Sequence, residues 1–270
     1  MKTPDLVFDV GAHHGSDTAH YLSLGYRVLA IEADPAIVAT LRHKFADAIA
    51  ADRLVVLECG IANKEGDLPF YVCPGNTEWN SFDKEWARAR GMEAIETSVK
   101  ARRFESVLKE YGTPLFAKID IEGCDGLCIN AFTKDNAPQF VSFEAGAHDF
   151  DLISHLYSIG YRRFALVNQY SFETTKIPSI GIPKHLAWSM KQIGRQFVRT
   201  HPIAHRIART LRPRLRFNNK AGGFSHDSAG PSPMERKEGW QEVDEFVYTW
   251  TSVVLSGILT SAWFDIHAAL

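Results

Sequence analysis

Three alternating charged side chains near the middle of the chain are the first residues that could do chemistry. Lys118, Asp120 and Glu122 occupy every second position of the segment Lys118-Ile-Asp-Ile-Glu-Gly123. Alternate residues of a β-strand project to the same side. Two carboxylates and an ammonium group are costly to bury unless they pair with one another or with a ligand. The pattern therefore predicts either a salt-bridged strand end or a cluster that binds a substrate and accepts a proton.

A second group of residues has the spacing of an adenosine-binding site. The segment Asp9-Val-Gly11-Ala-His-His-Gly15 follows an apolar run. Gly11 can adopt backbone angles that bring a ligand close to the main chain and to a helix N-terminus. Glu32 ends the next apolar run, 21 residues after Gly11, where an acidic residue accepts hydrogen bonds from ribose hydroxyls. Together the two signals predict an adenosine-type ligand.

His13 bears on which adenosine ligand this is. A dinucleotide fingerprint has the form G-x-G-x-x-G, and His13 stands at its second glycine. An imidazole at that position obstructs the close approach of a pyrophosphate to the backbone. The sequence therefore favours a ligand without a pyrophosphate, and an NAD-linked oxidoreductase is the alternative enzyme class.

Short apolar runs that alternate with helical segments must position these residues. We predict strands at 6–10, 27–31, 54–57, 69–72, 115–121, 140–144 and 163–167. We predict helices at 16–24, 34–45, 103–111, 126–132 and 151–158. Such alternation predicts an α/β fold with a mostly parallel central sheet and helices on both faces. Ligands of these sheets bind at the carboxyl ends of the strands, where both groups of residues lie.

Three motifs together resemble the FkbM family of S-adenosylmethionine-dependent methyltransferases. They are Asp9 to Gly15, Ala30-Ile-Glu-Ala-Asp-Pro35 and Lys118 to Gly123, and the resemblance covers about residues 5 to 168. It implies a Rossmann-like methyltransferase fold, S-adenosylmethionine as cofactor and, typically, O-methylation of a hydroxyl on a sugar, glycolipid or secondary metabolite. The family's first motif usually has Asn where His13 stands.

The resemblance also implies which residues contact the cofactor. Asp9, Gly11 and Gly15 would contact its methionine part, and Glu32 its ribose. The loop Gly60-Ile-Ala-Asn63 would lie near the adenine. The full predicted cofactor-binding set is Asp9, Gly11, His13, Gly15, Glu32, Asp34, Ile61 and Ala62.

Methyl transfer to an alcohol sets the requirements for the catalytic residues. It is an in-line displacement, so the protein must hold the hydroxyl in line and remove its proton. We expect Asp120 to be the base and Lys118 to orient the substrate oxygen. Glu122, Glu144 and His148 are further candidates, since Glu144 ends its own strand and His148 follows in the loop.

A metal site is a weaker expectation. Asp120, Glu122 and Asp125 could hold Mg²⁺, which prefers oxygen ligands, but nothing in their spacing demands it, and no residue is assigned as a metal ligand. The four cysteines have no zinc-site spacing, so we expect free thiols in a reducing compartment. The segment Trp79-Asn-Ser-Phe82, earlier in the chain, suits either sugar recognition or a structured lid.

The chain divides into three predicted parts. Its 270 residues, 45% hydrophobic and 23% charged, are typical of a globular protein. Residues 1–173 form the Rossmann-like core, 174–226 a basic helical insertion or cap, and 227–270 a segment that returns to the core. No signal-peptide pattern precedes the first predicted strand of the core, so we expect a cytoplasmic protein. The uncharged stretch 246–264 is expected to be a buried or half-buried helix rather than a membrane span.

The predicted insertion leaves three interpretations open. It has no acidic residue and eleven basic ones, and 184–216 has the pattern of basic amphipathic helices. These helices could contact an anionic membrane surface, cover the active site and bind an anionic or lipid-linked acceptor, or form a cap that faces water. Nucleic acid is not expected, because no recognition motif is present. A non-catalytic binding protein that acts through this insertion is the third functional class.

Overall fold

The structure is a computed structural model of the chain. It describes residues 2–75, 77–85, 94–177, 228, 230–257, 259 and 263–270. The basic helices predicted within 184–216 lie outside the described residues, so their three interpretations stay open.

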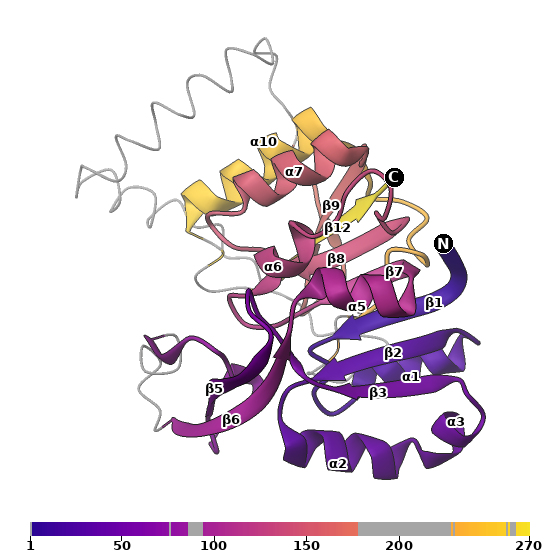
Figure 1. The fold of residues 1–270 in the computed structure, drawn as a ribbon. Coiled ribbons are helices and arrows are strands. Elements are labelled where there is room, and N and C mark those ends of the chain that lie inside the picture. Colours follow the sequence, from indigo (N-terminus) through magenta and orange to yellow (C-terminus); the bar gives the residue numbers. More distant parts are fainter. Residues whose placement is uncertain are drawn as a thin grey trace.

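A large sheet forms the centre of the described fold (Figure 1). Its strands follow the order β10-β9-β12-β8-β7-β1-β2-β3, and β11 pairs with β9. The bounds are β1 Lys2–Val10, β2 Arg27–Glu32, β3 Leu54–Glu58, β7 Thr113–Ile119, β8 Phe140–Glu144, β9 Arg163–Asn168, β10 Thr174–Thr175, β11 Gln241–Glu242 and β12 Phe264–Ala269. The pairs from β8 through β7, β1 and β2 to β3 are parallel. The predicted mostly parallel α/β sheet is confirmed.

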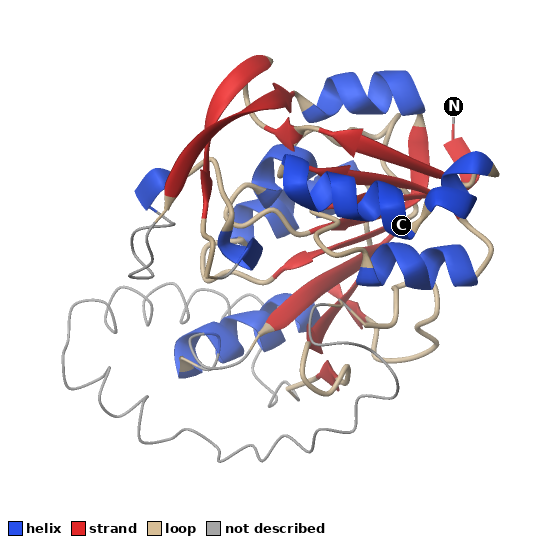
Figure 2. Ribbon diagram, turned by 90° about the horizontal axis from the view of Figure 1, so that it is seen from below, coloured by secondary structure: helices blue, strands red, loops and turns tan. Residues whose placement is uncertain are grey.

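Helices cover both faces of this sheet (Figure 2). They are α1 Ser16–Ser23, α2 Pro35–Lys44, α3 Ala46–Ala50, α5 Phe104–Tyr111, α6 Asp125–Ile129, α7 Phe150–Ile159 and α10 Val243–Ser256. Apolar residues of α1 and α2 pack with Val7 of β1, whereas those of α5, α6, α7 and α10 pack with Phe8. Because both faces are covered, residues 6–8 of β1 are consecutive apolar residues rather than alternating ones.

The end of the chain differs from its predicted helix. The helix α10 ends at Ser256, where Gly257 adopts a left-handed conformation, and β12 begins at Phe264. β12 runs antiparallel between β8 and β9. All of its residues are buried, so it shows none of the alternation by which a strand is recognised. None of the helices that the structure describes is long and apolar enough to cross a bilayer.

A smaller sheet lies beside the main one (Figure 1). It has the order β4-β6-β5, with β4 Gly60–Ile61, β5 Gly66–Val72 and β6 Ile95–Arg102. β6 was not predicted from the sequence, because most of its residues are exposed or half-buried and few are apolar. The connection after β5 contains a 3-10 turn at Thr77–Trp79, and residues 77–82 contribute to a pocket at the end of the main sheet.

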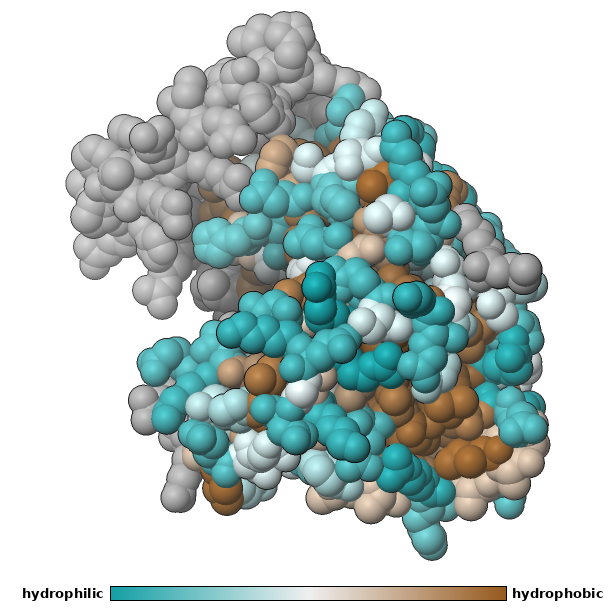
Figure 3. All heavy atoms as spheres, viewed as in Figure 1, coloured by the Kyte–Doolittle hydropathy of each residue, from teal (hydrophilic) through white to brown (hydrophobic). Residues whose placement is uncertain are grey.

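The edge of the main sheet at β3 is partly open. Figure 3 shows a largely hydrophilic face with a hydrophobic area near the position of β3 in Figure 1. On β3 itself, Val55 is 45% exposed. This strand is short, follows the charged residue Arg53 and ends at the charged residue Glu58. Short edges flanked by charge resist pairing with other chains.

The boundary of the core differs slightly from the predicted one. Thr174 and Thr175, assigned to the insertion, form β10 and pair with β9. The described core therefore runs through residue 175 and is completed by β11, α10 and β12 from the final part of the chain.

Candidate functional site

A pocket lies at the carboxyl ends of β1, β2 and β7, beneath residues 77–82. The predicted site residues that line it are Gly11, His13, Glu32, Ile61, Lys118, Asp120 and Glu122. The structure thus brings together the two groups of residues singled out in the sequence. Their meeting follows from the sheet order, because β1 lies between β2 and β7.

The turn after β1 is held tightly on two sides. Gly11 has a φ of 78°, and a Cβ on it would lie 1.9 Å from the backbone oxygen of Asp120. His13 has a φ of 47°, and its Nε2 lies 2.8 Å from the Thr77 hydroxyl. The close approach of the Asp120 backbone and the positive φ therefore require glycine at position 11.

Glu32 organises the backbone around the pocket. Its carboxylate accepts hydrogen bonds from the backbone N–H groups of His13 at 2.9 Å, Ala33 at 2.8 Å and Asp34 at 2.9 Å. Burial raises the pKa of the Glu32 carboxyl, and these N–H groups oppose that rise. Carboxylate oxygens have about four lone-pair sites, so Glu32 can still accept a hydrogen bond from a ribose hydroxyl.

Replacing Glu32 by alanine will weaken binding of S-adenosylhomocysteine by about tenfold or more and lower the free energy of unfolding by about 1–3 kcal/mol. The second effect arises because three backbone donors lose their acceptor. Calorimetry and urea unfolding measure the two effects. Glu58→Ala is the matched control, since Glu58 ends the adjacent strand in register with Glu32 but is much more exposed. Unchanged affinity in Glu32→Ala would contradict a ribose contact.

Lys118 forms a buried ionic cluster beneath the turn. Its Nζ donates to the Gly11 carbonyl at 3.0 Å and lies 3.4 Å from Asp120, 3.5 Å from Asp9 and 3.7 Å from Asp17. Burial alone would disfavour the ammonium form, but the carboxylates of Asp120, Asp9 and Asp17 raise the pKa of Lys118. Lys118 is therefore charged and its described contacts are with protein groups, so substrate orientation by Lys118 stays a prediction.

Four members of the predicted cofactor set are not in the pocket lining. Asp9 is fully buried and accepts a hydrogen bond from Thr18. Gly15 lies where a Cβ would be 2.6 Å from the Phe45 ring. Asp34 caps α2 by accepting from Ala36 N–H. Ala62, the fourth, bonds to the main chain of β6. These residues shape the elements around the pocket, and their direct contact with a cofactor stays a prediction.

The segment over the pocket supplies residues that sequence reasoning did not assign. The amide of Asn80 donates to Asp34 at 3.0 Å, and the Ser81 hydroxyl donates to the backbone oxygen of Glu122 at 3.2 Å. Phe82 also lines the pocket. The only signal in the sequence was the segment 79–82 itself. These contacts favour the structured lid over a free sugar-binding surface.

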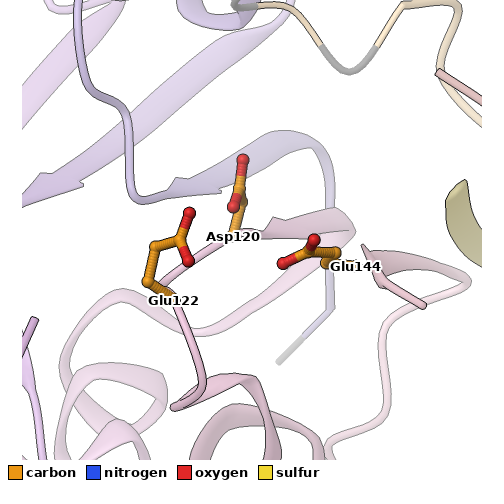
Figure 4. Close-up of side chains that lie close together, drawn as sticks. All are labelled: Asp120, Glu122 and Glu144. Atoms are coloured by element: carbon orange, nitrogen blue, oxygen red, sulfur yellow. The ribbon is translucent and has the colours of Figure 1, made fainter. Parts of the chain in front are cut away.

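Three carboxylates gather at one side of the pocket (Figure 4). Asp120 follows β7, Glu122 lies two residues on with a φ of 40°, and Glu144 ends β8. Each offers one oxygen, and these oxygens lie within 4.8 Å of one another. The left-handed turn at Glu122 and Gly123 directs Glu122 back toward the other two.

Two other candidates are not in this cluster. Asp125 was expected beside Asp120 and Glu122 as a ligand of Mg²⁺, but its Oδ1 accepts the backbone N–H of Ile121 at 2.9 Å. Glu144 takes that place in the structure. His148 is exposed in the loop after β8 and lies outside the pocket lining.

A pocket at the carboxyl ends of a mostly parallel sheet, with acidic groups beside it, is the arrangement of Rossmann-like methyltransferases. The chain belongs to the methyltransferase FkbM family, whose domain profile matches residues 9–172. The family predicted from three motifs is confirmed.

Similar proteins extend this comparison. A probable ribosomal RNA small subunit methyltransferase A of Haloarcula marismortui is 42% identical over 66 residues, which are 24% of this chain and 22% of that protein. The FkbM methyltransferase structure from Methylobacillus flagellatus KT is 20% identical with a TM-score of 0.42, covering 60% of this chain and 40% of the other. Coclaurine N-methyltransferase, solved with N-methylheliamine and S-adenosylhomocysteine, is 9% identical with a TM-score of 0.33, covering 99% and 67%.

Proposed function

We propose that this protein transfers a methyl group from S-adenosylmethionine to a hydroxyl of a small molecule such as a sugar, a glycolipid or a secondary metabolite. The observation that carries the proposal is the position of Asp120. Its half-buried carboxylate lines the same pocket as Glu32 and the turn after β1. A proton acceptor therefore faces the space beside the predicted cofactor site.

The residues present fit this cofactor. Glu32 keeps acceptor capacity toward the pocket and would hold the ribose hydroxyls. The turn at Gly11 and His13 exposes main chain to the ligand, and Ile61 offers an apolar wall near the expected adenine. No phosphate-binding glycine stands at His13, which fits a ligand without a pyrophosphate.

The chain's own part in the reaction is positioning and proton transfer. When bound, S-adenosylmethionine supplies a sulfonium methyl group whose C–S bond breaks as the acceptor oxygen forms its new C–O bond. The Asp120 carboxylate accepts the proton that the hydroxyl loses. Lys118, 3.4 Å from Asp120, holds that carboxylate in place. Residues 77–82 limit the access of water from above.

Calorimetric titration of the full chain with S-adenosylhomocysteine tests the cofactor, with NAD as the parallel control. We expect micromolar binding of the first and none of the second. Binding of NAD instead would favour the oxidoreductase. If neither binds, the nucleotide end of the sheet is vestigial or needs its acceptor first, and a non-catalytic binding protein becomes the favoured class.

The acceptor is tested by methyl transfer from labelled S-adenosylmethionine. Sugars, glycolipids and polyketide alcohols form one arm of the assay, and ribosomal RNA forms the other. The RNA arm is included because the Haloarcula relative is described as a ribosomal RNA methyltransferase. Label in the small-molecule arm supports the proposal, whereas label in RNA alone would replace it.

A further inference from the structure

We propose that Asp120, Glu122 and Glu144 bind a divalent cation, Mg²⁺ or Mn²⁺, which in turn binds two adjacent oxygens of the acceptor. This inference rests on the proposed methyl transfer and adds a substrate class to it. The three carboxylates come from the end of β7, the turn after it and the end of β8. One oxygen from each lies within 4.8 Å of the others, and all are the hard donors that such cations prefer.

The sheet itself places two of these ligands. β7 and β8 are parallel, and Ile119 is in register with Phe143. Asp120 and Glu144 each follow one residue later, so both project from neighbouring strand ends. Lys118 lies close to Asp120, but its ammonium group is shared with Asp9 and Asp17 on the β1 side. The arrangement concentrates carboxylate oxygens on the β8 side of the pocket.

Asp265 gives an independent indication of a ligand here. It stands opposite Glu144 in the pairing of β12 with β8, and paired residues project to the same face. Asp265 is only 6% exposed, and its carboxyl has no hydrogen bond or ion pair within 4 Å among the described residues. The charges that act on it most strongly are those of Asp120 and Glu144. A buried polar group directed at this cluster without a partner is costly, and water bound to a cation would satisfy it.

The site lies on the side of the pocket where an acceptor is expected. Glu32, the predicted ribose ligand, ends β2, whereas the carboxylates lie at β7 and β8 across the intervening strand β1. Asp120 and Glu122 line the pocket, and Glu144 lies just beyond its lining. A cation held here would therefore face the space between the cofactor and the acceptor.

The coordination chemistry indicates the acceptor class. Mg²⁺ takes about six oxygen ligands in an octahedron. Three carboxylate oxygens leave room for water and for two oxygens of an acceptor. Molecules with neighbouring hydroxyls, or a hydroxyl beside a carbonyl oxygen, fit this requirement. Because the cluster uses one oxygen of Asp120, the other remains for the proton of the acceptor hydroxyl.

Titration of the cofactor-free protein with Mn²⁺ alone tests the site, with bound metal followed by electron paramagnetic resonance. We expect one Mn²⁺ per chain in the wild type and binding weaker by about tenfold or more in Glu144→Gln. Glu105→Gln, an exposed acid on α5, is the matched control and should bind Mn²⁺ as the wild type does. Absence of Mn²⁺ binding in the wild type, or equal binding in Glu144→Gln, would overturn the proposal.

Two further measurements keep the result interpretable. Circular dichroism establishes that Glu144→Gln is folded, and Glu122→Gln replaces it if it is not. Titration with S-adenosylhomocysteine should give the same affinity in Glu144→Gln and the wild type, since Glu144 is not in the pocket lining. Binding of Mn²⁺ without binding of S-adenosylhomocysteine would refute the proposed methyl transfer but support the cation site. Binding of S-adenosylhomocysteine without binding of Mn²⁺ would refute only the cation site.

Discussion

Replacing Lys118 by methionine will lower the free energy of unfolding by about 3–5 kcal/mol, because it leaves buried carboxylates without their cation. Asp9 is fully buried, and its Oδ1 has no hydrogen-bond partner among the described residues but lies 3.5 Å from the ammonium group of Lys118. Asp17 is also buried and lies 3.7 Å from the same Nζ. Methionine keeps much of the volume, so the loss is electrostatic rather than a cavity effect. Urea unfolding measures it.

The dependence on pH separates this cause from a packing defect. Burial already raises the pKa of Asp9, while Lys118 lowers it. Without Lys118, the folded chain binds more protons than the unfolded chain, so stability falls as pH rises above the ordinary range of a carboxyl. The deficit of Lys118→Met should therefore be smaller near about pH 5 than near about pH 8.

Two variants serve as controls for this experiment. Lys109→Met removes an exposed lysine of α5 and should change stability by less than about 0.5 kcal/mol. Lys118→Met combined with Asp9→Asn should recover part of the loss, and it provides a measurable protein if the single variant does not fold. A deficit in Lys118→Met that is equal at both pH values would contradict the electrostatic explanation.

The loss should extend to cofactor binding, since Lys118 also donates to the Gly11 carbonyl. The sequence predicted that Lys118, Asp120 and Glu122 project to the same side of one strand, but β7 ends at Ile119 and Glu122 has a φ of 40°. Nor did the pattern show that Lys118 turns toward β1. That depends on β1 and β7 being neighbours with Asp9 opposite Lys118. Pairing between segments more than 100 residues apart is a tertiary property that a local pattern does not contain.

The parts of the site that could be predicted from sequence are those with a local cause. Gly11 and Glu32 lie at the ends of adjacent strands, and both line the pocket. Asp34 with Pro35 marked the start of α2, and the side chain of Asp34 does cap it. Each of these signals depends on a few neighbouring residues and on backbone geometry that the residue types themselves impose.

The parts that could not be predicted depend on burial and on distant pairing. β12 lacks alternation because both its faces are buried, including Asp265. Asp120, Glu122 and Asp125 were the carboxylates that the sequence offered for Mg²⁺, but Asp125 accepts a hydrogen bond from the main chain of Ile121. Glu144, from another strand, completes the cluster instead. Glu144 rather than Asp125 joins the cluster because the strand order places β8 beside β7.

Replacing Asp120 by asparagine will lower kcat for methyl transfer by about a hundredfold or more, because asparagine cannot accept the proton of the acceptor hydroxyl. The affinity for S-adenosylhomocysteine should stay near that of the wild type, since the two side chains have nearly the same shape. Labelled methyl transfer and calorimetry on the same protein measure both quantities. Asp151→Asn, on an exposed position of α7, is the matched control and should retain wild-type turnover.

The residual activity of Asp120→Asn then shows how Asp120 acts. If Asp120 accepts the proton, turnover of the variant rises with pH as hydroxide takes over that role, and saturating Mn²⁺ does not restore it. If Asp120 acts only as a ligand of the cation, saturating Mn²⁺ restores turnover, because the asparagine oxygen still binds the metal weakly. If Asp120→Asn turns over at the wild-type rate without added metal, both roles are contradicted. Glu122 and Glu144 would then be the acids to replace next.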